Sequence, residues 1–222
     1  MTTTSSDIFD AITSGDVDRV RALVAEDSGV AAARNADGLS AVTLARYHGR
    51  DDMVDVLLGG EPELDMFEAA AVGRTERVRE LVERDPALVS ALSPDGFTAL
   101  HFAAFFGHPD IARLLVERGA DVNAVARNPM HVMPLHSAAA ARQLEIARLL
   151  VDHGADVNAA QERGFTPLHE AAQNGDVELA RLLLEHGAHR DAAAEDGRRA
   201  PDFAAAGGHD EVLELLRNAE VG

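Results

Sequence analysis

The sequence predicts an all-α solenoid, a curved stack of repeated helix-turn-helix units. A stretch from Asp95 to Ala124, DGFTALHFAAFFGHPDIARLLVERGADVNA, recurs along the chain in closer and poorer copies. The matching positions are regularly spaced, because Leu135 follows Leu100 by 35 residues and Leu168 follows Leu135 by 33. Apolar residues inside the stretch also recur at helical spacing. A repeat of this length is typical of stacked units in which each copy contacts only its neighbours.

One unit is expected to contain two short helices. Ala103 and Ala104 are small, so the first helix can approach its neighbours closely. Gly107 divides it from a second helix, whose apolar face includes Leu114. Gly119 suits the left-handed backbone conformation that ends a helix, where a side chain would be strained. A unit therefore reads as turn, helix, reversal, helix, turn.

The repeated motifs resemble the ankyrin-repeat family, of a bacterial type. The openings TALHFAA at Thr98 and TPLHEAA at Thr166 carry the resemblance, together with the closing string GADVNA at Gly119 and Gly154. The resemblance covers essentially the whole chain. It implies helix pairs joined by short hairpin loops, and partners that dock on the hairpin tips and on the concave side formed by the first helices.

We expect a single domain over residues 1–222, with six or seven repeats. The approximate ranges are 6–36, 37–63, 64–94, 95–127, 128–161, 162–194 and 195–222. The second unit lacks the usual trailing turn, which leaves a short link at 59–64. A trimmed surface loop is the favoured interpretation, because loops tolerate changes of length, and a hinge is the alternative.

The unit that begins at 128 departs from the pattern. Its hairpin reads RNPMHVMP over 127–134, and His131 stands where the other units have the turn glycine. Simple loop variation and a loop that contacts a partner both remain open. Arg142 replaces the glycine between the two helices, so the backbone there is expected to be strained.

The composition disfavours several functions. The formal net charge is −18, from 38 acidic and 20 basic residues, and all the basic residues are arginine. This balance opposes attraction to nucleic acid or to anionic membranes. No apolar run approaches the length of a membrane span, no signal peptide is recognisable, and cysteine is absent. We expect a cytoplasmic protein, and the lysine-free, alanine-rich composition is typical of a GC-rich bacterial genome.

The sequence offers no catalytic, cofactor or metal motif. His101, His136 and His169 recur once per unit. Neighbouring helices lie about 8–10 Å apart, whereas an imidazole that binds zinc lies about 2 Å from the metal. Successive rings therefore cannot share one ion. We expect each ring to form hydrogen bonds with turn backbone.

The resemblance implies a recognition surface, and the aromatic residues favour it. Six of the nine aromatic residues fall on hairpin tips or on the open side of the first helices. Exposed apolar clusters commonly mark interaction surfaces. The candidate partner-binding residues are Leu39, Tyr47, Glu68, Phe97, Phe102, Phe105, Phe106, Phe165, Glu170, Gln173 and Asn174. The alternative is that Phe105 or Phe106 fills space between helices.

These residues predict a groove centred on the third to fifth units, apolar in the middle, with Glu68, Glu170, Gln173 and Asn174 at its rim. The predicted function is a non-enzymatic interaction module that binds a partner protein or peptide. The alternative is a small-molecule binder or an enzyme, which needs a deep pocket with convergent polar groups. A monomer is expected, and a homodimer through the same aromatic residues stays open.

Overall fold

Fourteen α-helices follow one another in the part of the chain that the structure describes, and they form seven successive pairs. The structure is a computed structural model that describes residues 3–218. Residues 1–2 and 219–222, which belong to the predicted domain 1–222, lie outside the described residues. The helices are α1 (Thr3–Ser14), α2 (Val17–Glu26), α3 (Ala41–Tyr47), α4 (Asp51–Gly59), α5 (Met66–Ala71), α6 (Thr75–Arg84), α7 (Ala99–Phe106), α8 (Pro109–Glu117), α9 (Pro134–Ala140), α10 (Leu144–Asp152), α11 (Pro167–Asn174), α12 (Val177–Glu185), α13 (Ala200–Gly207) and α14 (Asp210–Asn218), with short 3₁₀ turns at Ser28–Ala32, Pro86–Ser90 and Glu162–Gly164.

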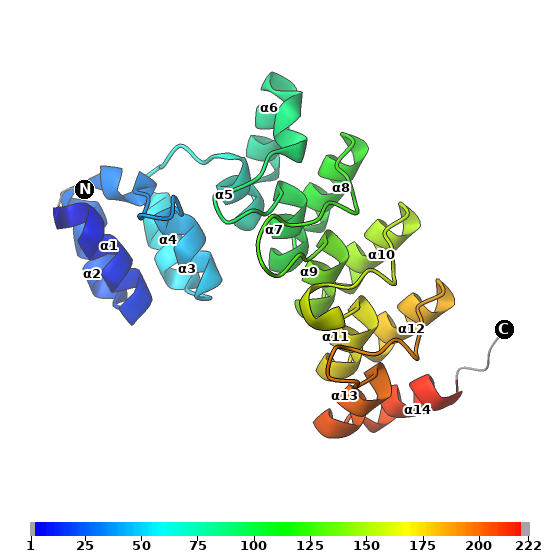
Figure 1. The fold of residues 1–222 in the computed structure, drawn as a ribbon. Coiled ribbons are helices and arrows are strands. Elements are labelled where there is room, and N and C mark those ends of the chain that lie inside the picture. Colours follow the sequence, from blue (N-terminus) through cyan, green and yellow to red (C-terminus); the bar gives the residue numbers. More distant parts are fainter. Residues whose placement is uncertain (1–2, 219–222) are drawn as a thin grey trace.

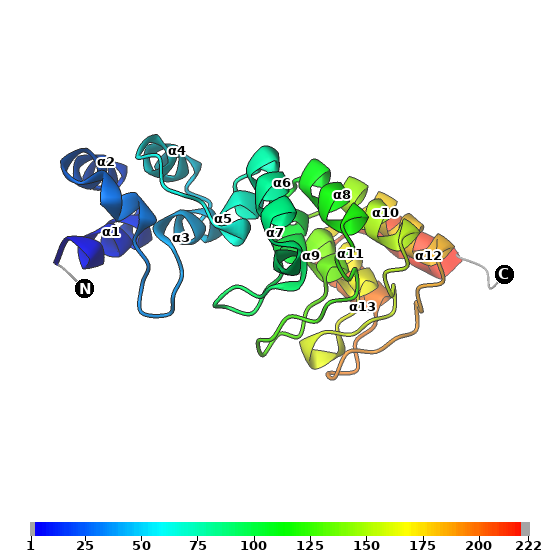
Figure 2. The same ribbon diagram turned by 90° about the horizontal axis from the view of Figure 1, so that it is seen from above.

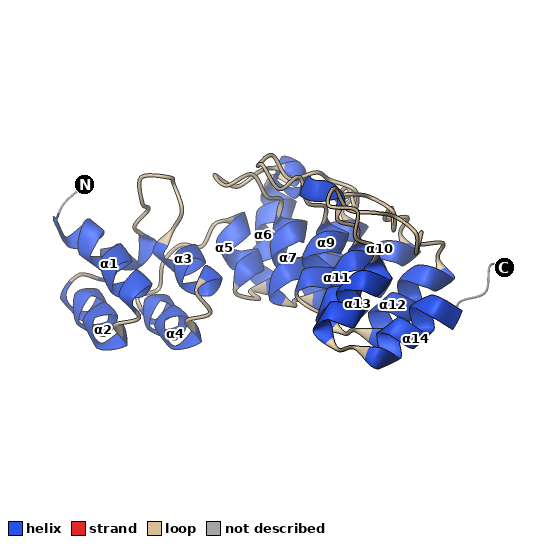
Figure 3. Cartoon of the chain, turned by 60° about the horizontal axis from the view of Figure 1, so that its bottom comes forward, coloured by secondary structure: helices blue, strands red, loops and turns tan. Residues whose placement is uncertain are grey.

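The helices form two rows in a curved stack (Figure 1). The first helices of the pairs, from α1 to α13, contact one another in chain order, and the second helices lie behind them (Figure 2). The loops that precede the first helices project together from one side of the stack (Figure 3). No strand occurs among the described residues, so the predicted all-α solenoid is confirmed. In the same residues, no helix has the length and apolar character that a membrane crossing needs.

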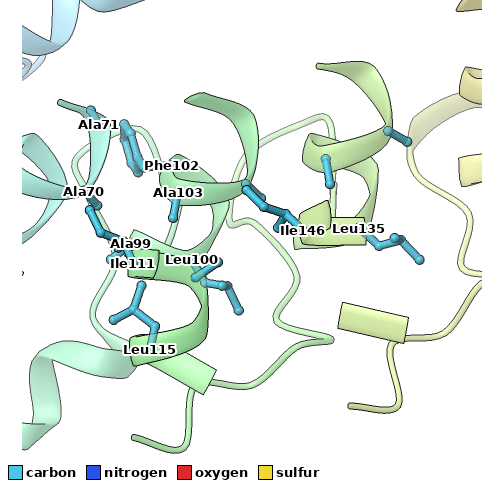
Figure 4. Packing of buried hydrophobic residues seen from close by; sticks show 14 of the residues in the cluster. Ala70, Ala71, Ala99, Leu100, Phe102, Ala103, Ile111, Leu115, Leu135 and Ile146 are labelled. Atoms are coloured by element: carbon cyan, nitrogen blue, oxygen red, sulfur yellow. The ribbon is translucent and has the colours of Figure 1, made fainter. Parts of the chain in front are cut away.

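Small and branched apolar side chains fill the space between the rows (Figure 4). Ala99 and Ala103 on α7 are fully buried, and so are Ile111 and Leu115 on α8. The alanines let neighbouring first helices approach closely, and the larger side chains of the second helices cover them. Burying one such leucine or isoleucine stabilises the fold by about 1.5–3 kcal/mol. This packing repeats from pair to pair and holds the first helices in register.

Hydrogen bonds join the loops of successive units. Three backbone hydrogen bonds of 2.9 Å link neighbouring hairpin tips. The N–H of Arg127 donates to the carbonyl of Gly96, that of Glu162 to the carbonyl of Met130, and that of Glu195 to the carbonyl of Arg163. Asn123 of the first GADVNA string donates to the carbonyl of Gly154 at 3.0 Å and accepts from the N–H of Asp156 at 2.8 Å. The loops therefore form a connected rim along one side of the stack.

Two residues of the irregular unit adopt left-handed backbone. His131 has a φ of 50° and Arg142 a φ of 58°. Glycine occupies the equivalent place between α7 and α8, where Gly107 has a φ of 77°. A side chain is disfavoured in this region of backbone space. The strain expected at Arg142 is therefore present.

The third pair has no hairpin loop in front of it, because the link from α4 to α5 spans only residues 60–65. Arg34, from the preceding hairpin, occupies this place and binds the carboxylates of Asp65 at 2.9 Å and Glu68 at 3.2 Å. The hairpins on either side approach each other directly, because a Cβ on Gly38 would lie 3.2 Å from Pro94. The second and fourth units therefore meet across the third.

Replacing Gly96 with Ala is expected to destabilise the protein by about 1–3 kcal/mol. Gly96 has a φ of 86°, and an added Cβ would lie 2.5 Å from the carbonyl oxygen of Arg127. Gly119 is the matched control, since it has the same φ and nothing lies within 4 Å of its Cβ position. Urea unfolding should show a larger loss for Gly96→Ala than for Gly119→Ala. Equal losses would contradict the close approach of the two hairpins.

Candidate functional site

A groove of about 500 Å³ opens between the hairpin loops and the first helices α3, α7, α9 and α11. It follows the row of first helices across the centre of the stack. We call it the aromatic groove. Its lining residues are Tyr47, Asp95, Phe97, His101, Phe102, Phe105, Phe106, Met130, Val132, His136, Ser137, Ala140, Gln161 and Glu170.

The N-terminal wall of the aromatic groove is a cluster of rings around Phe102. Tyr47 of α3, Phe67 of α5 and Phe97 of the hairpin lie with their ring centroids 6.0–6.1 Å from that of Phe102. Phe106 lies 6.2 Å from it on the same helix. These are distances at which aromatic rings attract one another. Three successive units and a hairpin therefore contribute to one apolar wall.

A hydrogen bond between units holds this wall. The Tyr47 hydroxyl donates to Oδ2 of Asp95, and the Ser93 hydroxyl donates to Oδ1 of the same carboxylate. Burial and the neighbouring Asp95 raise the pKa of the Tyr47 phenol far above its usual range. The phenol therefore stays protonated and acts as a donor. Because the third unit has no hairpin, Tyr47 of the second unit reaches the loop of the fourth.

Two histidines lie under the aromatic groove and connect units. His101 Nδ1 accepts from the Thr98 N–H at 3.2 Å, so Nε2 carries the proton and donates to the Val132 carbonyl at 3.1 Å. His136 has the same arrangement. Its Nδ1 accepts from the Met133 N–H at 3.2 Å, and its Nε2 donates to the Ala159 carbonyl at 3.0 Å. Burial lowers the pKa of His101 to about 4. The predicted hydrogen bonding to turn backbone is confirmed for these rings, which are neutral and use both nitrogens.

Glu170 forms the C-terminal wall of the aromatic groove. It lies on α11, and its Oε1 accepts from Nε2 of Gln161 at 2.8 Å. Burial raises the pKa of this carboxyl, and the hydrogen bond from Gln161 opposes the shift only in part. Between Glu170 and the rings, α9 contributes the small side chains Ser137 and Ala140. A carboxylate therefore faces an aromatic wall across a floor of small residues.

Two of the predicted site residues do not lie on the open surface, so their predicted exposure is wrong. Phe102 is only 2% exposed, because rings from α3, α5 and the hairpin cover it. Glu68 is 4% exposed, and its carboxylate accepts from the Asp65 N–H at 2.7 Å as well as from Arg34. Phe102 is thus the base of the aromatic wall. Glu68 is a capping residue at the start of α5.

The aromatic groove brings together Tyr47, Phe97, Phe105, Phe106 and Glu170 from the predicted set, with Phe102 beneath them. The other predicted residues lie elsewhere. Leu39 is half-buried at the tip of the second unit's hairpin, and Phe165 packs on Phe203 with centroids 4.9 Å apart. Gln173 is exposed near the end of α11. Asn174 donates to the carbonyl of Ala139 at 3.2 Å, which ties α11 to α9.

Eight of the residues that line the aromatic groove lay outside the predicted set, among them Asp95, Met130 and Gln161. Met130 is 46% exposed at the tip of the irregular hairpin. The RNPMHVMP string contained the signal for it, as an apolar side chain on a loop. In the sequence, Asp95 could be recognised only as a turn residue, and no sequence pattern marked Gln161 as a site residue. Their positions depend on how the hairpins stack.

Comparison with known proteins points to one family. A family model described as ankyrin repeats (3 copies) matches residues 66–161 and 135–222. The two matched regions together cover more than half of the chain.

Curated relatives match shorter segments. Alpha-latrocrustotoxin-Lt1a of Latrodectus tredecimguttatus is 42% identical over 65 residues, which are 29% of this chain and 4% of the toxin. Ankyrin repeat and SAM domain-containing protein 6 of Danio rerio is 41% identical over 59 residues, or 27% of this chain and 8% of the relative. Ankyrin repeat and SAM domain-containing protein 3 of Homo sapiens is 35% identical over 83 residues, which are 36% of this chain and 12% of the relative. The chain therefore spans a small part of each relative.

Proposed function

Because this chain belongs to the ankyrin-repeat family, whose members are generally protein-interaction modules, we propose that it binds a partner protein or peptide in the aromatic groove. One observation carries the choice of this site. Of the four large apolar side chains that are most exposed in the described residues, three line the aromatic groove. They are Tyr47, Phe105 and Met130, at 39%, 44% and 46% exposure. Clustered exposed apolar side chains are characteristic of interaction surfaces, and aromatic anchors contribute much of the binding energy.

The chemistry of the aromatic groove favours binding over catalysis. His101 and His136 use both ring nitrogens in hydrogen bonds that hold the fold. Asp95 is occupied by two hydroxyl donors. A general acid or base needs a free position within hydrogen-bond reach of a substrate. The proposed function is therefore non-enzymatic, and a small-molecule or enzymatic role of the same groove is the less favoured alternative.

The remaining features of the proposal follow from charge and composition. The proposed partner is a protein or peptide and neither nucleic acid nor membrane, because the formal net charge of −18 repels phosphate groups. We propose a monomer in the cytoplasm. Self-association through the aromatic groove would appear as a larger mass in solution.

Replacing Phe105 with Asp is expected to abolish partner binding and to change the unfolding free energy by no more than about 0.5 kcal/mol, as for other exposed positions. A carboxylate placed in the groove would have to lose its water when a partner covers it. The measurement is capture of partners from an extract of the source organism, followed by mass spectrometry. Val125→Asp is the matched control, since Val125 is 45% exposed and is not among the residues that line the aromatic groove.

The Val125→Asp variant should capture the same proteins as the wild-type chain. If Phe105→Asp also captures them with equal yield, the aromatic groove is not the binding site. Thermal unfolding of both variants checks that each remains folded.

A further inference from the structure

The charged side chains that line the aromatic groove are all acidic. Among the described residues that line it, Asp95 and Glu170 are carboxylates, the two histidines are neutral, and none is arginine. The guanidinium of Arg46 lies over the ring of Phe106, with its carbon 4.6 Å from the ring centroid. It is held outside the lining by Asp51 and by the carbonyl of Ala71. The groove is therefore negative, as is the chain.

Glu170 is the lining carboxylate that lacks a compensating cation. Asp95 is satisfied by the hydroxyls of Tyr47 and Ser93. In the described residues no ion pair includes Glu170, and the only hydrogen bond to its side chain comes from the neutral amide of Gln161. Burying a carboxylate without a cation is unfavourable, and it raises the pKa of Glu170.

Glu68 is a buried carboxylate that shows how the chain balances such a charge, whereas Glu170 is half-buried. Glu68 lies at the start of α5, three units before the one that contains Glu170. Its side chain receives the guanidinium of Arg34 at 3.2 Å and the Asp65 N–H at 2.7 Å. The chain thus supplies its own cation where the carboxylate has a structural role. Glu170, which is half-buried, has no such ion pair among the described residues.

The space beside Glu170 suits a long side chain. Ser137 and Ala140 on α9 are small, and α9 lies between α7 and α11. The rings of Phe105 and Phe106 on α7 and the carboxylate of Glu170 on α11 line the same groove on either side of α9. A side chain placed over α9 therefore lies between the rings and the carboxylate. The volume of about 500 Å³ is within the usual range of ligand sites, about 300–1,000 Å³. Lysine and arginine combine an apolar stem with a charged end, which matches this arrangement of rings and carboxylate.

We infer that the aromatic groove recognises a basic segment of its partner, with one lysine or arginine whose methylene stem lies against Phe105 and Phe106 and whose cation pairs with Glu170. The inference rests on the proposed function, because it names the chemistry of the partner at the same site. Gln161 positions the Glu170 carboxylate for this contact. The negative charge of the whole chain favours encounter with a basic segment.

A library of nine-residue peptides tests this inference. Each pool fixes one amino acid at one position, and the full chain is the bait. The wild-type chain should enrich lysine or arginine at one position. For a selected basic peptide, Glu170→Gln should weaken binding about tenfold or more, because one partner of a partly buried charge pair is lost. Glu178→Gln is the control, since Glu178 is exposed on α12 and its loss changes the net charge equally.

A second change completes the test. Replacing the selected lysine or arginine of the peptide with norleucine keeps an apolar stem and removes the charge. Binding should weaken with the wild-type chain, and Glu170→Gln should show little further loss, because both changes remove the same contact. Enrichment of acidic or apolar residues alone, or a basic preference that survives Glu170→Gln, overturns the inference. Retention of no peptide also overturns it, while the proposed function is decided separately by partner capture with Phe105→Asp.

Discussion

Replacing Phe102 with Ala is expected to destabilise the protein by about 3–5 kcal/mol, whereas replacing Phe105 with Ala is expected to cost less than about 1 kcal/mol. The two residues are three positions apart on α7 and are 2% and 44% exposed. Phe102 contacts rings of three other elements, so its removal leaves a cavity between units. Phe105 contacts Phe106 at 5.2 Å and otherwise faces the groove. Urea unfolding at neutral pH measures both changes.

The fluorescence of Tyr47 reports on the aromatic wall during urea unfolding. Tyr47 is the only tyrosine, tryptophan is absent, and its ring lies 6.1 Å from that of Phe102. Tyrosine fluorescence therefore follows the aromatic wall, and circular dichroism follows all the helices. Because most contacts join successive first helices, damage at Phe102 should weaken the stack locally. Phe102→Ala should therefore separate the two transitions, with the fluorescence change at lower urea. Losses of equal size for Phe102→Ala and Phe105→Ala would contradict the burial that distinguishes them.

The fold could be predicted from the sequence because its determinants are local. Gly107 and Gly119 were expected at helix ends, and both have positive φ, 77° and 86°. His101 was expected to bond turn backbone, because histidine recurs at the same place in the next two units, as His136 and His169. Such features require only the sequence of one unit and the assumption that copies stack.

The composition of the site could not be predicted in full, because it depends on contacts between units that are not adjacent. Phe102 was assigned to the open surface from its place on a first helix. Tyr47 covers it by reaching Asp95, two units further along the stack. That contact exists only because the third unit has no hairpin of its own. The sequence revealed the short link at 59–64, but not which side chains it would bring together.

The exposure expected for Glu68 was wrong because the residue stands at a buried capping position. Its position on the first helix of the third unit resembled a rim position. Asp65 is the N-cap of α5, and the Glu68 side chain accepts from the Asp65 N–H and from Arg34. Glu68 stands at the third residue of its helix, the place that His101, His136 and His169 hold in the following units, and these histidines are buried too. The burial of Glu68 therefore follows from its place in the repeat.

Acidification is expected to destabilise the protein through its buried histidines, by about 3 kcal/mol for His101 alone between pH 6.5 and 4. Burial lowers the pKa of His101 from 6.5 to about 4, and the pKa of His136 moves in the same direction. Between these values the unfolded chain binds a proton that the folded chain does not. The free energy of unfolding therefore falls as the pH falls through this window and is independent of His101 well above pH 6.5. Carboxylates also titrate below about pH 5, so a variant is needed to isolate the histidine.

His101→Gln supplies that comparison, because glutamine does not titrate. The variant should be less stable than the wild-type chain at pH 7.5, since it loses the paired bonds to Thr98 and Val132. The difference between the two unfolding free energies should shrink steadily towards pH 4, because only the wild-type chain has a buried imidazole that resists protonation. Urea unfolding at pH 7.5, 6, 5 and 4 provides the values. A constant difference across this range would mean that His101 has the same pKa in the folded and unfolded states, which would contradict the effect of its burial.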